Sequence, residues 1–265
     1  MEATGGYETA LTTALVMAKV ALHRAAPWQA HSFARSLGNT AKTDSLDAKA
    51  LARFAAERHA NLRRFELPSQ DQQTINELMM RRTDLISSQM AEKARAGHPR
   101  YTAATSAVQQ SIADSLAFLD SQIKAIEAQI EALVAEAPEM NARGAIMTSV
   151  TGIGQKTARI LQAFLPELGH LSRRAAASLA GCAPQAKDSG SLRKHRSVFG
   201  GRAAIKRALF TAALSARTHD PAMRAFFERL TNAGKPKMVA IVAIMRKIIV
   251  RLNAMLRPQQ IETSW

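Results

Sequence analysis

Residues 145–164 read AIMTSVTGIGQKTARILQAF, and this stretch determines the kind of fold that the sequence predicts. Two segments of mixed apolar and polar residues flank a short turn, in which Gly152 and Gly154 stand on either side of the apolar Ile153. Glycine is favoured where a chain must reverse within a few residues. The pattern predicts a helix, a tight hairpin and a second helix, and the alanine-rich, strand-poor sequence around it predicts a mainly α protein.

This predicted unit resembles a helix-hairpin-helix module, in which backbone N–H groups at a helix N-terminus hold a phosphate group. On that interpretation Gly152, Gly154 and Lys156 are candidate nucleic-acid-binding residues. The alternative is a structural hairpin that makes no contact with DNA. The sequence leaves both interpretations open.

A long helical section occupies residues 68–138 and is interrupted at Gly97-His98-Pro99. Its second arm carries apolar residues at spacings of three and four, which is a heptad pattern. The members of this seam are Val108, Ile112, Leu116, Leu119, Ile123, Ile126, Ile130 and Leu133. The seam predicts an antiparallel helical hairpin or a two-chain coiled coil. A stripe that packs on its own domain is an equally open interpretation.

Residues 1–67 read as an incomplete α/β domain. Thr43 is a candidate N-cap, with Asp44 and Asp47 in the first turn of the helix that follows. The expected elements are helices over residues 7–21, 27–37 and 44–59, a short strand over 20–25 and an extended segment over 63–67 that ends at Pro68.

Residues 139–257 form the third section. Beyond the predicted helix-hairpin-helix, the patterns of apolar residues, prolines and glycines predict four more helices and a tail. The helices are expected over residues 173–179, 203–218, 221–232 and 236–256, and the tail over 258–265.

The net charge of +15 lies entirely in this third section. Residues 168–257 hold 18 lysines and arginines against 3 acids, an excess that equals the net charge of the whole chain. A basic block beside a neutral one indicates a domain that binds a polyanion, most often nucleic acid. A merely solvated basic surface is the alternative. A membrane role is disfavoured, because the basic residues do not follow one face of an amphipathic helix.

The single cysteine, Cys182, excludes a disulfide framework and suits the reducing cytosol. The most apolar run, residues 238–245, is too short to span a bilayer. These features predict a cytoplasmic protein that makes no contact with a membrane.

Residues 181–207 read GCAPQAKDSGSLRKHRSVFGGRAAIKR and are the most basic, glycine-punctuated stretch of the chain. Ser189 lies at the centre and is the best candidate for a nucleophile, although an ordinary turn serine in a phosphate-binding loop is the alternative. Arginine offers a fork of donors that matches phosphate oxygens, and glycine lets the backbone approach a bulky ligand. The candidate nucleic-acid-binding residues here are Lys187, Gly190, Arg193, Lys194, Arg196, Arg202, Lys206 and Arg207.

An acidic half-site is the second candidate for chemistry. Asp44 and Asp47 are three residues apart and therefore neighbours on one helix face. Their carboxylates suit Mg²⁺, which takes a few carboxylates and keeps several waters. Glu2 is a third carboxylate that only the fold could bring to them. The alternative for the two aspartates is helix capping, because acids in a first turn favour the macrodipole without any metal.

Several motifs together resemble the transposases of the insertion-sequence-one-ten type and the related Piv-like DNA invertases. The resemblance covers nearly the whole chain and follows the order of the family. The motifs are MEATGGYE (1–8), KTDSLDAKALARFA (42–55), SVTGIGQKTA (149–158), LAGCAPQAKDSG (179–190), FGGRAAIKRALFTAALSA (199–216) and GKPKMVAIVAIMRKIIVRLNAML (234–256).

The resemblance implies a RuvC-like, RNase H-type domain with a DEDD acidic set over residues 1–67, a coiled-coil linker over 68–138 and a transposase domain over 139–257. It implies that Glu2, Asp44 and Asp47 bind Mg²⁺ and that Ser189 attacks DNA and becomes covalently linked to it. It also implies a structured bridge RNA that selects the DNA, and a homo-oligomer, dimer or tetramer. The expected location is the bacterial cytoplasm, in association with the nucleoid.

One departure from the family pattern concerns the N-terminus. Family members carry an earlier strand with the first aspartate in a GIDVSK-like motif, and this sequence begins at MEATGGYE. The expectation is a truncated RuvC-like domain that lacks one metal ligand, in a chain that is inactive or impaired alone. The hypotheses are therefore a serine-dependent DNA recombinase, a non-catalytic nucleic-acid-binding remnant and, with less support, a structure-specific nuclease.

Overall fold

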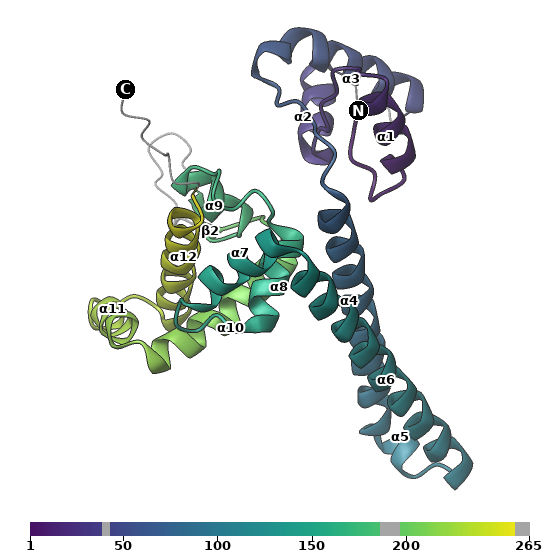
Figure 1. Cartoon of the computed structure of the whole chain (residues 1–265), viewed down its shortest axis with the longest axis vertical. Coiled ribbons are helices and arrows are strands. Elements are labelled where there is room, and N and C mark those ends of the chain that lie inside the picture. Colours follow the sequence, from purple (N-terminus) through teal and green to yellow (C-terminus); the bar gives the residue numbers. More distant parts are fainter. Residues whose placement is uncertain (39–42, 186–196, 258–265) are drawn as a thin grey trace. The chain divides into compact units, whose positions relative to one another are not determined.

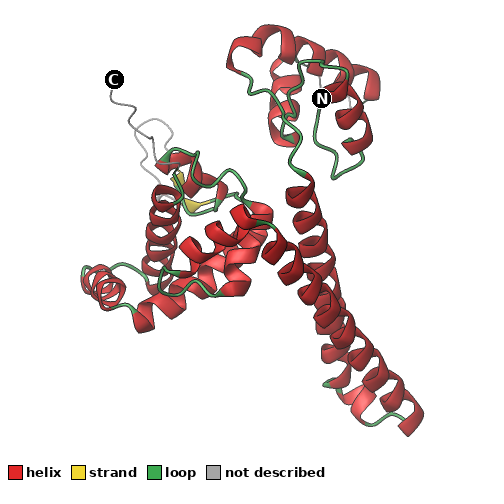
Figure 2. Ribbon diagram, in the orientation of Figure 1, coloured by secondary structure: helices red, strands yellow, loops and turns green. Residues whose placement is uncertain are grey.

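A computed structural model describes residues 1–38, 43–185 and 197–257. The chain divides into two compact units, Met1–Ser69 and Gln70–Trp265. Helices form nearly all of the regular structure, and the described strands are one pair of two residues each (Figure 2). The expectation of a mainly α protein is confirmed.

The first unit contains α1 (Thr9–Met17), α2 (Pro27–Ser36), α3 (Asp44–Arg58) and the short 3₁₀ helix η1 (His59–Asn61). Helices α2 and α3 pack together, with the rings of Phe33 and Phe54 edge to face at 5.2 Å between centroids. The predictions for α2 and α3 are confirmed. The side chain of Thr43 caps α3 by accepting a hydrogen bond from the Leu46 backbone N–H, at 3.4 Å.

The prediction of a helix over residues 7–21 is too long at both ends. Helix α1 ends at Met17 because Lys19 adopts a left-handed conformation, with φ of 59°. The backbone N–H groups of Lys19 and Val20 then bond to the carbonyls of Val16 and Leu15, the Schellman arrangement that closes a helix.

The prediction of a strand over residues 20–25 is also wrong, because the backbone there forms an isolated bridge and no ladder. Ala25 exchanges backbone hydrogen bonds with Met1 and Ala3, at 2.8 and 3.0 Å, and Glu2 pairs with it in parallel. On the other side, the Phe65 N–H donates to the Leu22 carbonyl at 2.7 Å. Residues 22–25 thus lie between two extended segments, one of them the expected segment over 63–67.

The long helical section is an antiparallel hairpin of α4 (Gln70–Ala96) and α6 (Ser106–Glu136), joined through the short helix α5 (Pro99–Thr102) (Figure 1). Ile75, Met79, Ile130 and Val134 are buried where the hairpin meets the rest of the second unit. Toward the tip the seam is less covered, and Val108 is exposed. The prediction of an antiparallel hairpin is confirmed, while pairing with a second chain stays a prediction.

The remaining helices form one core. They are α7 (Pro138–Thr148), α8 (Gln155–Phe164), α9 (Arg173–Leu179), α10 (Ala203–His219), α11 (Pro221–Asn232) and α12 (Lys237–Met255). The apolar face of α12, including Ile244, Ile248 and Leu252, is fully buried because these residues recur every four positions on one side. Small alanines of α10 allow α8 and α12 to approach it closely. The predicted helices of this section are confirmed.

No helix in the described parts of the chain combines the length and the apolar character needed to cross a membrane.

Candidate nucleic-acid interface

The segment that carries Ser189 begins and ends at a crossing of two glycine backbones. Gly181 and Gly201 both have left-handed φ, at 64° and 81°. A Cβ on Gly201 would lie 2.2 Å from the Gly181 nitrogen, and a Cβ on Gly181 would lie 2.5 Å from the Gly200 carbonyl oxygen. Only glycine permits so close an approach. At Gly201, the freedom that was expected to admit a ligand therefore admits another segment of the protein's own backbone.

Beyond the crossing, the two chain segments pair. Strand β1 (Pro184–Gln185) is antiparallel to β2 (Ser197–Val198), with Pro184 opposite Val198. The Arg202 N–H donates to the Leu179 carbonyl at 2.8 Å and closes the base. The predicted residues Lys187, Ser189, Gly190, Arg193, Lys194 and Arg196 lie between β1 and β2, outside the described residues.

Cys182 follows the crossing and is buried. Burial raises the pKa of its thiol to about 11, although the nearby charges of Lys206 and Arg246 act in the opposite direction. A thiol with such a pKa is almost fully protonated near neutral pH and is a poor nucleophile. Cys182, which is also buried, is therefore a poor candidate for a nucleophile.

The three predicted cations at the start of α10 differ in their surroundings. Arg202 holds the Glu167 carboxylate with two hydrogen bonds, at 2.9 and 2.7 Å, and also donates to the Phe164 carbonyl. This guanidinium fastens α10 to the segment after α8. Lys206 is half-buried beside Gly181, and Arg207 is exposed. Of the three, Arg207 is the most accessible to a phosphate.

The predicted helix, turn and helix are observed as α7, a turn and α8, and the first glycine of the turn packs against α10. Gly152 has φ of 94°, and a Cβ there would lie 2.4 Å from the Ala212 carbonyl oxygen of α10. The turn inserts the buried Ile153 into the core. Gly154, the N-cap of α8, faces open space. The structural interpretation of the hairpin thus accounts for Gly152, whereas a phosphate contact at Gly154 stays a prediction.

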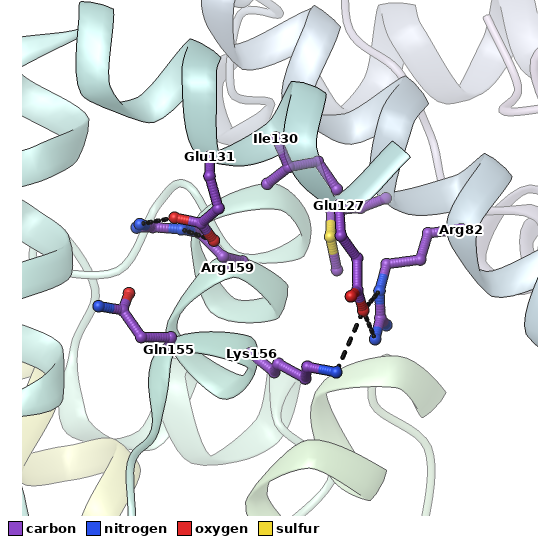
Figure 3. A pocket seen from close by; sticks show the side chains of 8 residues that line it. Arg82, Glu127, Ile130, Glu131, Gln155, Lys156 and Arg159 are labelled. Atoms are coloured by element: carbon purple, nitrogen blue, oxygen red, sulfur yellow. Dashed lines mark hydrogen bonds and ion pairs between the residues drawn. The ribbon is translucent and has the colours of Figure 1, made fainter. Parts of the chain in front are cut away.

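Lys156, the third predicted residue of this hairpin, lies at a pocket that sequence reasoning missed. The pocket lies between α4, α6 and α8 and has a volume of about 220 Å³ (Figure 3). Glu127 accepts from Arg82 at 2.8 and 2.6 Å and pairs with Lys156 at 3.2 Å. Burial raises the pKa of Glu127, but these cations outweigh it and lower the pKa below the ordinary value. Lys156 is still 75% exposed.

A second ion pair lines the same pocket. Arg159, whose side chain is 9% exposed, holds Glu131 through two hydrogen bonds, at 3.1 and 2.7 Å. Gly144 leaves room for it, because a Cβ there would lie 2.8 Å from a guanidinium nitrogen. Two salt bridges thus join the helical hairpin to α8. The spacing of Glu127 and Glu131, one turn apart on α6, is the sequence signal that could have indicated them.

The acidic candidates all lie in the first unit. Asp44 and Asp47 occupy the first turn of α3, where acids favour the helix macrodipole. Glu2 is half-buried and fixed by its backbone bridge to Ala25. Within the described residues, no three histidines, cysteines or acids gather as a metal-binding group. These three carboxylates therefore do not form a complete metal site there.

Glu8 is an acidic residue of this unit that sequence reasoning did not single out. It is buried, and its carboxylate accepts hydrogen bonds from the Thr4 N–H, the Thr4 hydroxyl and the Gly6 N–H, at 3.0, 3.0 and 2.9 Å. Its own backbone N–H, together with these donors, lowers the pKa of Glu8 to about 2 against the effect of burial. Glu8 thus holds the N-terminal turn, and a glutamate two residues after Gly-Gly was the available signal.

Two family models match successive parts of the chain. Residues 144–228 match the family described as Transposase IS116/IS110/IS902 family, and residues 1–97 match a transposase family of the DEDD IS110 type. A DEDD-type region followed by a basic helical unit defines the chain as a transposase, an enzyme of DNA recombination. It belongs to the IS116/IS110/IS902 transposase family.

Individual relatives agree with this assignment. The chain is 30% identical to the pilin gene-inverting proteins of Moraxella bovis and Moraxella lacunata over 261 residues, which cover 97% of this chain and 79% of each relative. It is 36% identical over 154 residues to an uncharacterized 43.6 kDa protein of the insertion element IS110 from Streptomyces coelicolor. That alignment covers 56% of this chain and 36% of the relative.

Proposed function

We propose that this chain is a DNA recombinase that cleaves and rejoins strands with Ser189 as its nucleophile. The observation that carries the proposal is the Gly181–Gly201 crossing, because it brings the two ends of the Ser189 segment together at the start of α10. The base of the segment lies beside Lys206, and the exposed Arg207 follows Lys206 in α10. Membership of a transposase family supports DNA as the substrate.

The chemistry is a transfer of one phosphodiester bond. The Ser189 hydroxyl oxygen attacks a DNA phosphorus, its proton is removed, and the bond from phosphorus to the leaving sugar oxygen breaks as that oxygen gains a proton. The DNA is then joined to the serine. A sugar hydroxyl of the target strand next attacks the same phosphorus and releases the serine, which regains a proton. Arginine and lysine side chains around the loop stabilise the charge that develops on the phosphate oxygens.

Mg²⁺ is the metal that we propose for the acidic set, since a DEDD-type region is expected to depend on a divalent metal. Asp44 and Asp47, one helix turn apart, would supply two carboxylates to it. The described residues do not complete the ligand set. Bound Mg²⁺ would supply a positive charge beside the reacting phosphate.

The remaining parts of the proposal concern domains and partners. We propose that residues 1–67 belong to a RuvC-like domain, supported by the backbone pairing of residues 22–25 on both sides. The α7–α8 hairpin would serve as a helix-hairpin-helix element. The partly exposed seam of α6 would pair with a second copy in a dimer or tetramer. A structured guide RNA would bind the same basic unit.

The test is the formation of a covalent protein–DNA adduct, which survives denaturing electrophoresis. Ser189→Ala should abolish the adduct and leave DNA affinity nearly unchanged, whereas Ser191→Ala, in the same segment, should retain it. Adducts that persist in Ser189→Ala would overturn the assignment of the nucleophile. A chain that binds DNA but forms no adduct with any substrate would instead be the non-catalytic nucleic-acid-binding protein of the alternative hypothesis.

A further inference from the structure

One basic surface of the second unit contains none of the predicted site residues. It is formed by the end of α10, by α11 and by α12, which pack against one another. Arg229 and Lys247 both lie over the ring of Phe226, at 5.2 and 4.0 Å from its centroid, and Arg217 lies over Phe227 at 5.1 Å. These five residues are called the Phe226 patch below.

The cations of the Phe226 patch are available to a ligand. Arg229 and Lys247 are exposed, and in the described ranges no carboxylate forms an ion pair with them or with Arg217. Residues 197–257 include twelve lysines and arginines and two acids. One of these acids, Asp220, already caps α11 by accepting from the Ala222 and Met223 N–H groups. The other acid, Glu228, forms no ion pair among the described residues, and the three cations of the patch therefore keep a net positive charge.

The aromatic rings determine what the patch can recognise. A cation over a ring face is held in place by the ring quadrupole, which reduces the freedom it would lose on binding an anion. With cations already over Phe226 and Phe227, the rings offer little face for stacking a base. The patch thus favours phosphate groups over bases, and its recognition should not depend on sequence.

Helix α10 connects the base of the Ser189 segment to the helices that carry the patch. Gly201 lies just before α10 begins, and α11 starts just after α10 ends (Figure 1). A helix rises about 1.5 Å per residue, so the ends of this helix are about 24 Å apart. That length corresponds to roughly seven nucleotide steps of about 3.4 Å along a duplex. A nucleic acid that contacts the start of α10 can therefore also reach Arg217, near the end of this helix.

We propose that the Phe226 patch is a second binding site for a phosphodiester backbone, in addition to the cations at the start of α10. The proposal deepens the recombinase function and rests on it for the reacting end. Its own prediction concerns binding alone. Duplex DNA and a structured RNA share this backbone chemistry and are compared separately in the test.

The experiment measures affinity of the full-length chain for a 30-base-pair DNA duplex and for an RNA hairpin, by fluorescence anisotropy over a salt series. For duplex DNA, Arg229→Ala/Lys247→Ala should weaken binding about fivefold to tenfold. It should also lower the slope of log affinity against log salt by about 1.8, or about 0.9 for each phosphate that is no longer neutralised. Arg229→Lys/Lys247→Arg should restore most of the affinity. Phe226→Leu keeps an apolar side chain, and its affinity should lie between that of the parent chain and that of the double alanine variant.

The matched control is Lys93→Ala/Arg100→Ala in the helical hairpin, where Arg100 lies over the ring of Tyr101 at 5.8 Å. This variant also removes two positive charges, together with one cation–π pair. Its affinity for nucleic acid should be nearly that of the parent chain. Equal losses of affinity in both variants, or no loss in the patch variant on either nucleic acid, would overturn the proposal. A loss on DNA, on RNA or on both supports it and identifies the ligand. Thermal unfolding shows that each variant is folded.

The outcomes separate this proposal from the nucleophile assignment. Ser189→Ala tests adduct formation, and the patch variant tests affinity in the absence of any reaction. Normal affinity in the patch variant with adduct loss in Ser189→Ala would leave the recombinase function intact and remove the patch. Reduced affinity in the patch variant, together with adducts that persist in Ser189→Ala, would support the patch and overturn the assignment of Ser189 as the nucleophile.

Discussion

Gly201 crosses Gly181 so closely that a Cβ on Gly201 would lie 2.2 Å from the Gly181 nitrogen and 2.3 Å from its Cα. The atoms in the way are backbone atoms, which cannot turn aside as a side chain can. The crossing is therefore a fixed feature of the base of the Ser189 segment. Packing within the protein therefore explains why glycine is needed at this base.

Gly201→Ala should consequently destabilise the second unit by far more than Gly200→Ala. Gly200 has a similar φ of 75° but nothing within 4 Å of a built Cβ, so its substitution costs only the left-handed strain of about 1–2 kcal/mol. Urea unfolding followed by circular dichroism measures both. Equal losses of stability in the two variants would show that the crossing opens without cost.

The two glycines of the α7–α8 turn should also respond differently. Gly152→Ala would place a Cβ 2.4 Å from the Ala212 carbonyl oxygen, so α8 and α10 would have to separate. Gly154 has an ordinary φ of −89° and open space, so Gly154→Ala should change stability by no more than about 0.5 kcal/mol. Melting temperatures test this pair, and a stable Gly152→Ala variant would contradict it.

The lowered pKa of Glu8 predicts that the stability of the first unit depends on pH only under acidic conditions. Because the pKa is lowered to about 2 in the folded protein, from 4.5, the carboxylate stabilises the first unit fully above the unfolded value. That stability should be lost as the pH falls from 4.5 toward 2. Glu8→Gln should therefore be less stable than the parent at about pH 7 and should approach it at low pH. Unfolding curves at several pH values measure the difference, and Glu66→Gln, an exposed glutamate, serves as a control.

Glu127, in the pocket between α4, α6 and α8, should stabilise both the helical hairpin, through Arg82, and its attachment to α8, through Lys156. Glu127→Gln would leave the guanidinium of Arg82, 13% exposed, without its carboxylate and should cost about 1.5–3 kcal/mol. Asp120→Asn removes an exposed pair with Lys124 on the same helix and should have a much smaller effect on stability. Chemical unfolding of both variants measures this. Similar losses of stability would contradict a structural role for Glu127.

Much of the helical structure was predictable because its determinants are local. Thr43 before two aspartates marks the start of α3, and Pro221 after Asp220 marks that of α11. The heptad seam predicted the arm that became α6. The predictions failed where the local pattern of residue types did not determine the backbone conformation. Lys19 ended α1 early in a left-handed conformation, and residues 20–25 lacked enough partners to become a strand.

The candidate site was predictable only in its composition. The charge excess and the order of motifs indicated a basic nucleic-acid unit, and family membership now supports that interpretation. The role of individual residues was not accessible in the same way. Arg202 is a candidate for binding nucleic acid, and the structure adds that it holds Glu167, 35 residues away. Gly152 is a candidate for a phosphate contact, and the structure adds that it packs on α10.

The sequence by itself determined the helices, the placement of positive charge and the candidates for attacking or holding a phosphate. These properties depend on residue types within a turn or two of chain. Only the tertiary structure decided which glycines cross, which cations are neutralised and which lie over aromatic rings at the surface. Those outcomes depend on contacts between residues tens of positions apart, such as Glu127 with Arg82 and Phe226 with Lys247, and such contacts form only when the helices pack.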